Sequence, residues 1–195
     1  MKRVCVFSGS NVGGRAEYQS SAVDLGRTLA ANGVGLAYGG ASVGLMGAVA
    51  DAVLAEHGEA VGVIPQQLVD KELAHTELTE LRIVTSMHER KALLADLADG
   101  FIALPGGFGT LEEFAEIVTW SQLGLHAKPC GLLNAEGFYD TLLQFVDHAV
   151  DERFIPASHR DLILVGDSPA ELLDAMWHWE PPAGDKWIDL RAPAP

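Results

Sequence analysis

The sequence has few basic residues and few cysteines. Lysine and arginine together number 13, against 27 aspartate and glutamate residues, which gives a net charge of −14. Because such a chain repels phosphate backbones, we do not expect a nucleic-acid polymer as its partner. The two cysteines, Cys5 and Cys130, lie in short apolar runs, so we expect small buried side chains rather than a disulfide or a reactive thiol.

Membrane and metal patterns are missing as well. The longest apolar runs have the length of a strand, well below the ~20 residues that a membrane span needs, and polar residues 8–19 interrupt any signal-peptide pattern. We therefore expect a cytoplasmic protein without membrane contacts. The seven histidines are scattered and there is no paired cysteine or His-Glu-x-x-His pattern, so no metal site is expected.

Short apolar runs alternate with amphipathic stretches along most of the chain. The apolar runs predict strands at residues 3–8, 33–38, 60–64, 81–84, 100–104, 130–133 and 162–165. The amphipathic stretches predict helices at residues 17–31, 44–56, 87–97, 110–123, 137–151 and 169–179. This alternation is typical of an α/β fold, here a doubly wound, Rossmann-like parallel sheet of about seven strands with helices on both faces.

The length of the chain suits a single domain, because two domains of this total size would each have a small core. We expect that domain to span residues 1–180. Residues 181–195 are rich in proline and break the alternation of strands and helices, which predicts a loose or surface-docked C-terminal tail.

Two glycine-rich turns each follow a predicted strand and open a predicted helix. The first spans residues 39–47 and the second residues 105–113. Glycine lets the backbone approach a ligand closely, and a helix N-terminus adds free N–H donors and a partial positive charge. We expect the two turns to lie on neighbouring strand ends and to converge on one anion, with the hydroxyls of Ser42 and Thr110 nearby. The alternative is that both are only tight strand-to-helix turns.

Two common phosphate ligands are disfavoured. A P-loop ends in Gly-Lys-Ser/Thr, but Gly44 is followed by Leu45, so the lysine of nucleotide triphosphate hydrolases is missing. A dinucleotide-binding fold places an acidic residue at the end of the next strand, whereas the strand at 60–64 is followed by Pro65, Gln66 and Gln67. A monophosphate needs neither feature and remains as the expected ligand.

Acidic residues open the helix after the second turn. Glu112 and Glu113 fall in its first turn, where the helix dipole alone favours a carboxylate by about 0.3–1 kcal/mol. Glu113 lies three residues after Thr110 and shares its face, so we expect Glu113 to face the ligand, with Glu116 as the fallback.

Basic residues open the helix at residues 87–97. Arg90 and Lys91 lie in its first turn, where the helix dipole disfavours cations. A local rule broken at a ligand-binding edge indicates function, and the alternative is a pair of solvated surface cations.

These motifs resemble those of the Lonely Guy (LOG) family of cytokinin-activating phosphoribohydrolases. Residues 105–113 fit the family's PGGxGTxxE motif, residues 86–91 resemble its second motif, and residues 39–47 resemble its earlier glycine turn. The similarity runs from about Val4 to the helix ending near Trp179, which makes residues 1–180 a nucleotide-binding phosphoribohydrolase domain. The resemblance implies hydrolysis of the N-glycosidic bond of cytokinin riboside 5′-monophosphates, and of AMP, to free base and ribose 5-phosphate.

The resemblance also implies the residues that carry this activity. It places Arg90 and Glu113 as the catalytic pair. It implies substrate contacts at Glu72, Lys91, Gly107, Phe108, Gly109, Thr110, Leu111, Glu112 and Thr119. Further contacts with phosphate or base are expected from the turns, at Ser10, Gly40, Ser42, Gly44 and Met87. The implied partners are a nucleoside 5′-monophosphate and a second copy of the chain, as a homodimer, with no cofactor.

Two other functions compete with this one. A molybdenum-cofactor carrier, which binds without catalysis, has a similar fold and part of the same motif. Many relatives are also labelled lysine decarboxylases, but a pyridoxal enzyme needs a Schiff-base lysine with a partner for the cofactor ring. Only Lys91 of the five lysines lies near the expected site, so the sequence does not favour a pyridoxal enzyme.

Overall fold

The computed structural model describes residues 1–71 and 73–182. Its seven strands are β1 (Arg3–Phe7), β2 (Gly35–Tyr38), β3 (Ala60–Pro65), β4 (Glu80–Val84), β5 (Gly100–Ala103), β6 (Cys130–Leu133) and β7 (Ile163–Gly166). The helices are α1 (Ala16–Ala31), α2 (Gly44–Ala55), α3 (Gln66–Val69), α4 (Met87–Leu97), α5 (Phe108–Gln122), α6 (Asp140–Asp151), α7 (Ala157–Arg160) and α8 (Pro169–Trp177), with a 3-10 turn, η1 (Ala135–Gly137).

The strands form one parallel sheet in the order β4-β3-β2-β1-β5-β6-β7. The chain builds the sheet outward from β1 on one side and then returns to β1 to build the other side from β5. In register, Val4 of β1 lies between Leu36 of β2 and Gly100 of β5. Ligands of doubly wound folds bind where the strand order reverses in this way, beyond the carboxyl ends of the strands. That switch point lies between β1 and β5.

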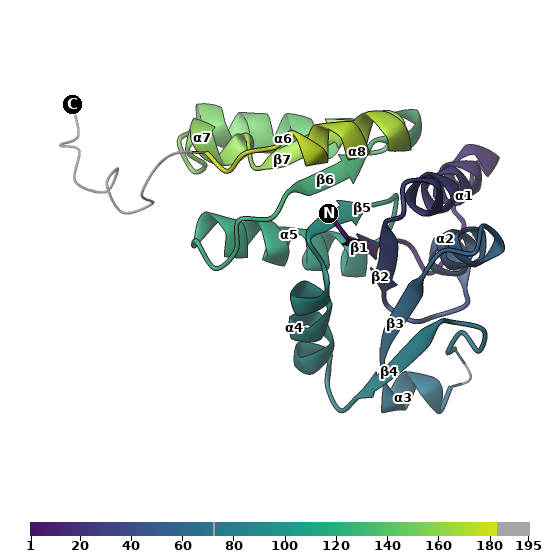
Figure 1. The fold of residues 1–195 in the computed structure, drawn as a ribbon. Helices are drawn as coiled ribbons and strands as arrows, with labels where there is room; N and C mark the ends of the chain where they lie inside the picture. Colours follow the sequence, from purple (N-terminus) through teal and green to yellow (C-terminus); the bar gives the residue numbers. More distant parts are fainter. Residues whose placement is uncertain (72, 183–195) are drawn as a thin grey trace.

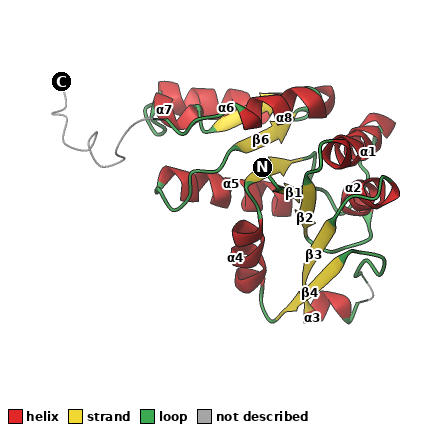
Figure 2. Cartoon of the chain, in the orientation of Figure 1, coloured by secondary structure: helices red, strands yellow, loops and turns green. Residues whose placement is uncertain are grey.

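Each face of the sheet has its own hydrophobic core. Side chains alternate along β1, so that Val4 and Val6 pack with α1, α2 and α8, while Cys5 and Phe7 pack with α4 and α5. Helix α6 covers the second face together with α4 and α5. Figures 1 and 2 show α1 and α2 on the opposite side of the sheet from α4. The doubly wound α/β prediction is therefore confirmed, with helices on both faces.

Most elements lie where the sequence predicts them, and the differences have local causes. Strand β6 and helix α4 match their predicted bounds residue for residue. Strand β2 begins at Gly35 rather than at residue 33, and α6 begins at Asp140 rather than at 137. Gly33 and Gly137 have φ angles of 66° and 68°, which fit neither a strand nor a right-handed helix. The short helices α3 and α7 and the turn η1 were not predicted.

Both cysteines are buried and unpaired, as the sequence predicts. Burial raises the pKa of the Cys130 thiol to about 12 and raises the pKa of Cys5 as well. No helix in the described part of the chain combines the length and the apolar character that crossing a bilayer requires. The predicted tail at 181–195 lies mostly outside the described residues, which end at 182.

Candidate active site

Helix α4 begins with a capping box that fixes its first turn. The Ser86 hydroxyl accepts a hydrogen bond from the Glu89 N–H at 3.1 Å, and the Glu89 carboxylate accepts one from the Thr85 N–H at 2.8 Å. Arg90 follows directly, and its side chain turns into the protein, where it is 9% exposed. The cap thus sets the direction in which Arg90 leaves the helix.

Arg90 and Glu113 form a buried ion pair. Nη1 of Arg90 donates to Oε1 of Glu113 at 2.7 Å, and Nε donates to the Val63 carbonyl at 3.1 Å. The guanidinium has no other hydrogen-bond partner within residues 1–71 and 73–182, so three of its five N–H groups remain for a ligand. Gly39 makes room for the guanidinium, because a Cβ there would collide with Nη2. The structure thus brings the two residues of the predicted catalytic pair into contact.

The groups around Glu113 shift the pKa of its carboxyl in opposite directions. The residue is 8% exposed, and burial raises the pKa of its carboxyl, while the Arg90 guanidinium opposes that rise. The Glu112 carboxylate raises the pKa of Glu113 further and the Lys91 ammonium lowers it. A carboxylate that is easily protonated and close to a cation is suited to accept a proton or to stabilise positive charge on a ligand.

Lys91 links the same two helices beside this pair. Its ammonium donates to Oε1 of Glu112 at 2.7 Å and lies 3.0 Å from Oε2 of Glu116. These carboxylates raise the pKa of Lys91, so the side chain is held as an ammonium. Lys91 and Arg90 are therefore paired and largely buried, which excludes the alternative of two solvated surface cations. The sequence predicts Glu116 only as the alternative to Glu113 on the ligand side. The contact between Glu116 and Lys91 was not predicted.

The turn after β1 lies between the two predicted glycine turns. The turns at 39–47 and 105–113 do not follow neighbouring strands, because β1 separates β2 from β5; that expectation was wrong. Instead the Gly9 N–H donates to the Pro105 carbonyl at 3.0 Å, and the Leu45 N–H donates to the Gly9 carbonyl at 3.0 Å. The loop after β1 thus connects both glycine turns. The sequence cannot show this, since strand order depends on how the helices cross over the sheet.

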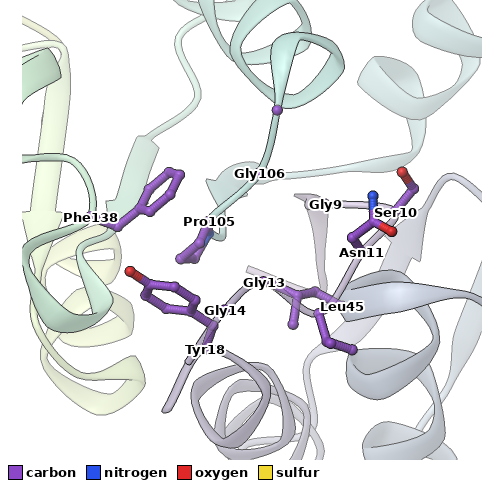
Figure 3. Close-up of a pocket in the computed structure, with 12 residues that line it drawn as sticks. Gly9, Ser10, Asn11, Gly13, Gly14, Tyr18, Leu45, Pro105, Gly106 and Phe138 are labelled. Carbon is purple, nitrogen blue, oxygen red and sulfur yellow. The ribbon is translucent and has the colours of Figure 1, made fainter. Parts of the chain in front are cut away.

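A cleft of about 280 Å³ opens at the switch point between β1 and β5. It is lined by the loop after β1, the turn after β5 and two aromatic side chains. Figure 3 shows Tyr18 and Phe138 at one end of the cleft and Ser10 and Asn11 at the other. The rings of Tyr18 and Phe138 meet edge to face at 5.7 Å.

Several predicted contact residues lie around this edge of the sheet. Gly107 lines the cleft, and Phe108, next in sequence, is 92% exposed. Thr110 is 3% exposed and lies beneath Gly106, where a Cβ would collide with its hydroxyl. Met87 is 45% exposed on the first turn of α4. Glu72 lies outside the described residues.

Two predicted residues on α5 face elsewhere. Leu111 and Thr119 line a second, apolar cavity of about 270 Å³ between α5 and α6. The Thr119 hydroxyl donates to the Ala115 carbonyl at 2.7 Å. Thr119 follows Glu113 by six residues and projects about 120° away from it around the helix. Within a single chain, Thr119 therefore does not reach the Arg90–Glu113 pair.

The first glycine turn has mainly structural contacts. Gly40 and Gly44 have φ angles of 75° and 62°, and a Cβ at Gly44 would collide with the backbone of Ser10. Ser42 is exposed within a Gly-x-Ser-x-Gly spacing, the pattern of a hydrolase nucleophile. His75 lies next to this turn, because its backbone N–H donates to the Gly40 carbonyl. Its Nε2 is hydrogen-bonded to the Asp51 carboxylate, and its Nδ1 accepts a hydrogen bond from the Glu77 N–H. His75 therefore has no free ring nitrogen that could act as the base for Ser42.

Part of the cleft is formed by residues that the sequence did not predict. Gly13, Gly14, Tyr18 and Phe138 all line it, and none was predicted as a site residue. A signal was present, because Gly13 and Gly14 follow a strand that the fold places at the switch point. That signal depends on knowing that β1 is the central strand.

The fold and the site together define a class of protein. It is a doubly wound α/β protein with a glycine-lined cleft at the switch point and a buried arginine–glutamate pair beside it. Residues 46–176 match the family model described as "Possible lysine decarboxylase". A rice (Oryza sativa subsp. japonica) protein named "Probable cytokinin riboside 5′-monophosphate phosphoribohydrolase" is 52% identical over 92% of this chain and 79% of its own length.

Other relatives agree with this match. A second rice phosphoribohydrolase of the same specificity is 50% identical over 88% of this chain and 71% of its own length. An Arabidopsis thaliana cytokinin riboside 5′-monophosphate phosphoribohydrolase is 47% identical over 92% of this chain and 84% of its own length. The chain belongs to the LOG family of cytokinin riboside 5′-monophosphate phosphoribohydrolases.

Solved structures share the fold at low sequence identity. A molybdenum cofactor binding protein from Rippkaea orientalis has a TM-score of 0.69 and 20% identity, covering 91% of this chain and 96% of its own. A molybdenum cofactor carrier protein from Chlamydomonas reinhardtii has a TM-score of 0.64 and 20% identity, covering 89% of this chain and 94% of its own. At this identity the likeness concerns the fold alone.

The residues at the site do not fit pyridoxal chemistry. A Schiff-base lysine must lose its proton to react, which a lowered pKa favours. Lys91 is held by two carboxylates that raise its pKa, and it is the only lysine on α4 or α5. The description "lysine decarboxylase" therefore finds no support in the geometry.

Proposed function

We propose that this enzyme hydrolyses the N-glycosidic bond of cytokinin riboside 5′-monophosphates, and of AMP, to free base and ribose 5-phosphate. The observation that carries the proposal is the buried Arg90–Glu113 pair, joined at 2.7 Å at the ligand-binding edge of the sheet. Family membership at about half identity supports the reaction class, since the relatives are named for this hydrolysis.

The mechanism rests on the charge that develops in the sugar. When the bond between C1′ and the base nitrogen breaks, positive charge builds on the ribose ring, and a nearby carboxylate stabilises it. Oε1 of Glu113 accepts the bond from Arg90, which leaves Oε2 for the ligand. In this proposal Glu113 lies under C1′, orients the attacking water and accepts its proton, while the hydroxide forms the bond to C1′. The base leaves with the bonding electrons and takes up a proton from solvent, and Glu113 then releases its proton to solvent.

Arg90 acts on this carboxylate and on the substrate. Its charge opposes the effect of burial on the pKa of Glu113 and so favours the ionised carboxylate. Its unused N–H groups bind the ribose or the departing base. The substrate contacts that the family resemblance adds to the proposal are Glu72, Lys91, Gly107, Phe108, Gly109, Thr110, Leu111, Glu112 and Thr119.

The test compares the enzyme with its Glu113→Gln variant. Purified protein is incubated with AMP and with N6-isopentenyl-AMP, and the released base is measured by chromatography. We expect the wild type to release base from both, and Glu113→Gln to lower kcat by at least about 100-fold while still binding AMP. Binding of AMP by the wild type without any release of base would instead support a carrier. Near-normal turnover in the variant would remove Glu113 from its role.

We also propose that the enzyme works as a cytoplasmic homodimer. The apolar cavity between α5 and α6 and the exposed side chains of Leu125 and Phe145, which are 67% and 65% exposed, suit burial against a second copy. Thr119 faces away from Glu113 of its own chain. In the proposed dimer it contacts the site of the partner subunit instead. Sedimentation equilibrium tests this, and a mass equal to one chain would contradict it.

A further inference from the structure

The segment at residues 73–75 lies against the first glycine turn. The Ser42 N–H donates to the Leu73 carbonyl at 3.0 Å, and the His75 N–H donates to the Gly40 carbonyl at 2.9 Å. Between these two bonds the backbones form an isolated antiparallel bridge. The segment therefore fixes the backbone of the turn that leads from β2 into α2.

The side chain of His75 ties this segment to α2. The residue is 6% exposed. The Glu77 N–H donates to Nδ1 of the ring at 3.2 Å, and a backbone N–H can only donate, so the ring proton lies on Nε2. The Nε2–H group then donates to Oδ1 of Asp51, on α2, at 2.9 Å. The imidazole thus joins the segment to the helix that the glycine turn opens.

Packing alone does not explain a histidine at this place. An apolar side chain would fill the same buried space without needing hydrogen-bond partners. A neutral imidazole has one acceptor and one donor on a rigid ring, so it binds the Glu77 N–H and Asp51 at the same time. Because the Asp51 side chain is 69% exposed, its bond to His75 adds little stability. What the two side chains supply is a fixed position of the segment.

The turn held in this way bounds the Arg90 guanidinium. Gly39 is next to the carbonyl that accepts the His75 N–H, and a Cβ at Gly39 would collide with Nη2 of Arg90. Nε of the guanidinium donates to the Val63 carbonyl and Nη1 to Glu113. Nη2 has no such bond within the described part of the chain, so packing against the turn limits its position. A displaced turn would give the guanidinium room to move away from Glu113.

We propose that His75 and Asp51 are positioning residues of the active site. They hold residues 73–75 on the first glycine turn, and the turn keeps the Arg90 guanidinium against Glu113. Neither side chain contacts the substrate, and both act through the backbone of the turn. This inference rests on the proposed function and adds to it two residues that neither the sequence motifs nor the relatives' names assign.

The first test compares Asp51→Ala with Asp51→Asn. Both substitutions remove the charge, but asparagine keeps the Oδ1 acceptor for the His75 ring, so a difference between them reports the hydrogen bond. Carbon NMR titration of the Glu113 carboxyl, without substrate, measures its pKa, and base release from AMP gives kcat and KM.

The expected shift follows from the charge of Arg90. Arg90 lowers the pKa of Glu113, so a looser guanidinium in Asp51→Ala should raise this pKa. In Asp51→Ala, kcat should fall by about threefold or more with little change in KM, while Tm stays within about 2 °C of the wild type. Asp51→Asn should have the pKa and the kcat of the wild type.

A second test pairs His75→Ala with His126→Ala. The His126 ring makes the same two kinds of bond, since Nδ1 accepts from the Lys128 N–H at 3.2 Å and Nε2 donates to the Ile117 carbonyl at 2.9 Å. These bonds hold a loop on α5 rather than on the glycine turn. Both variants should have a lower Tm, but only His75→Ala should raise the pKa of Glu113 and lower kcat, by about tenfold. The Asp51 variants decide the matter if His75→Ala does not fold.

Three results would overturn the inference. These are an unchanged pKa of Glu113 in Asp51→Ala, an Asp51→Asn variant that behaves as Asp51→Ala does, and a pKa shift in His126→Ala equal to that in His75→Ala. The titration needs no substrate, so it gives its answer whether or not the proposed function holds. Failure of the proposed function is seen separately, as wild-type protein that releases no base from AMP or N6-isopentenyl-AMP.

Discussion

Arg90 and Glu113 lie 23 residues apart in the sequence and share one buried hydrogen-bonded ion pair. Neither side chain is suited to burial alone, because an unpaired buried charge is strongly destabilising. Lys91 and Glu112 surround the pair with a second cation and a second anion. The pKa of Glu113 is therefore set by named neighbours that can be changed one at a time.

The pH dependence of kcat should report this carboxyl group. Burial raises the pKa of Glu113, so kcat should fall toward acid with a pKa above the ordinary glutamate value of about 4.3. Lys91→Gln removes a cation that lowers this pKa, so the acid limb should move to higher pH. Glu112→Gln removes an anion that raises it, so the limb should move to lower pH. Profiles measured with saturating substrate check both signs, and shifts in one common direction would contradict the assignment.

Single site residues were predictable from the sequence where their charge or their helix face is informative. Arg90 stood out because a cation at a helix N-terminus breaks a local rule, and Glu113 because it shares a face with Thr110. Gly14 could not be recognised as a cleft residue in this way, since glycine is common in loops and its place in the cleft depends on the fold. The side on which Thr119 projects was not predicted either, because the resemblance gave the residue without its direction.

At the scale of elements, two helices begin with the same capping box. Ser86 and Glu89 cap α4, and Ser168 and Glu171 cap α8, with the serine hydroxyl accepting the N–H of the glutamate in each. Only α4 carries a residue of the buried pair. This duplication provides a matched control inside one chain.

Removal of either cap should lower stability by a similar amount, but only removal of the cap of α4 should lower activity. Ser86→Ala and Ser168→Ala should each lower the free energy of unfolding by about 1 kcal/mol, measured by urea denaturation. Only Ser86→Ala should lower kcat/KM, because a frayed first turn lets Arg90 leave Glu113. Equal kcat/KM in the two variants would show that the cap of α4 does not position Arg90.

Long helices and apolar strands were predictable, and single-turn helices were not. Helix α4 spans eleven residues, about three turns, and strand β6 is a buried apolar run between Pro129 and Asn134. Helices α3 and α7 have four residues each, about one turn, which is too short for a 3.6-residue period to appear. The starts of β2 and α6 depend on positive φ angles at glycine, which composition does not reveal.

At the scale of the whole molecule, residues up to Trp179 form the seven-stranded sheet and its two cores. Within residues 1–71 and 73–182, Trp179 is the last side chain that packs against a core, the one beneath α4, α5 and α6. We infer that residues 1–180 form a single catalytic domain to which the tail at 181–195 is an appendage.

Truncation tests this division of the chain. A chain ending at Glu180 should keep kcat/KM within about twofold of the full chain and keep its Tm, since it retains all seven strands and every side chain of the two cores described above. A chain ending at Trp177 loses Trp179 and should have a lower Tm. A large loss of activity in the chain ending at Glu180 would give the tail a part in the site.

The fold class was predictable from alternation alone, whereas the strand order was not. Seven apolar runs separated by helical stretches define a parallel sheet, but they do not tell which strand is central. Placing β1 between β2 and β5 is a property of the crossovers, and it decides which turns meet.

The central place of β1 also bears on how the chain is made. β1 precedes the other six described strands in the chain, and its partner β5, which ends at Ala103, follows almost a hundred residues later. Until then a nascent sheet of β1 to β4 has an open edge at β1 in addition to the one at β4, and open strand edges attract other chains. The β1 edge, which later joins the two halves of the crevice, is therefore an additional place where the unfinished protein is prone to aggregate during synthesis.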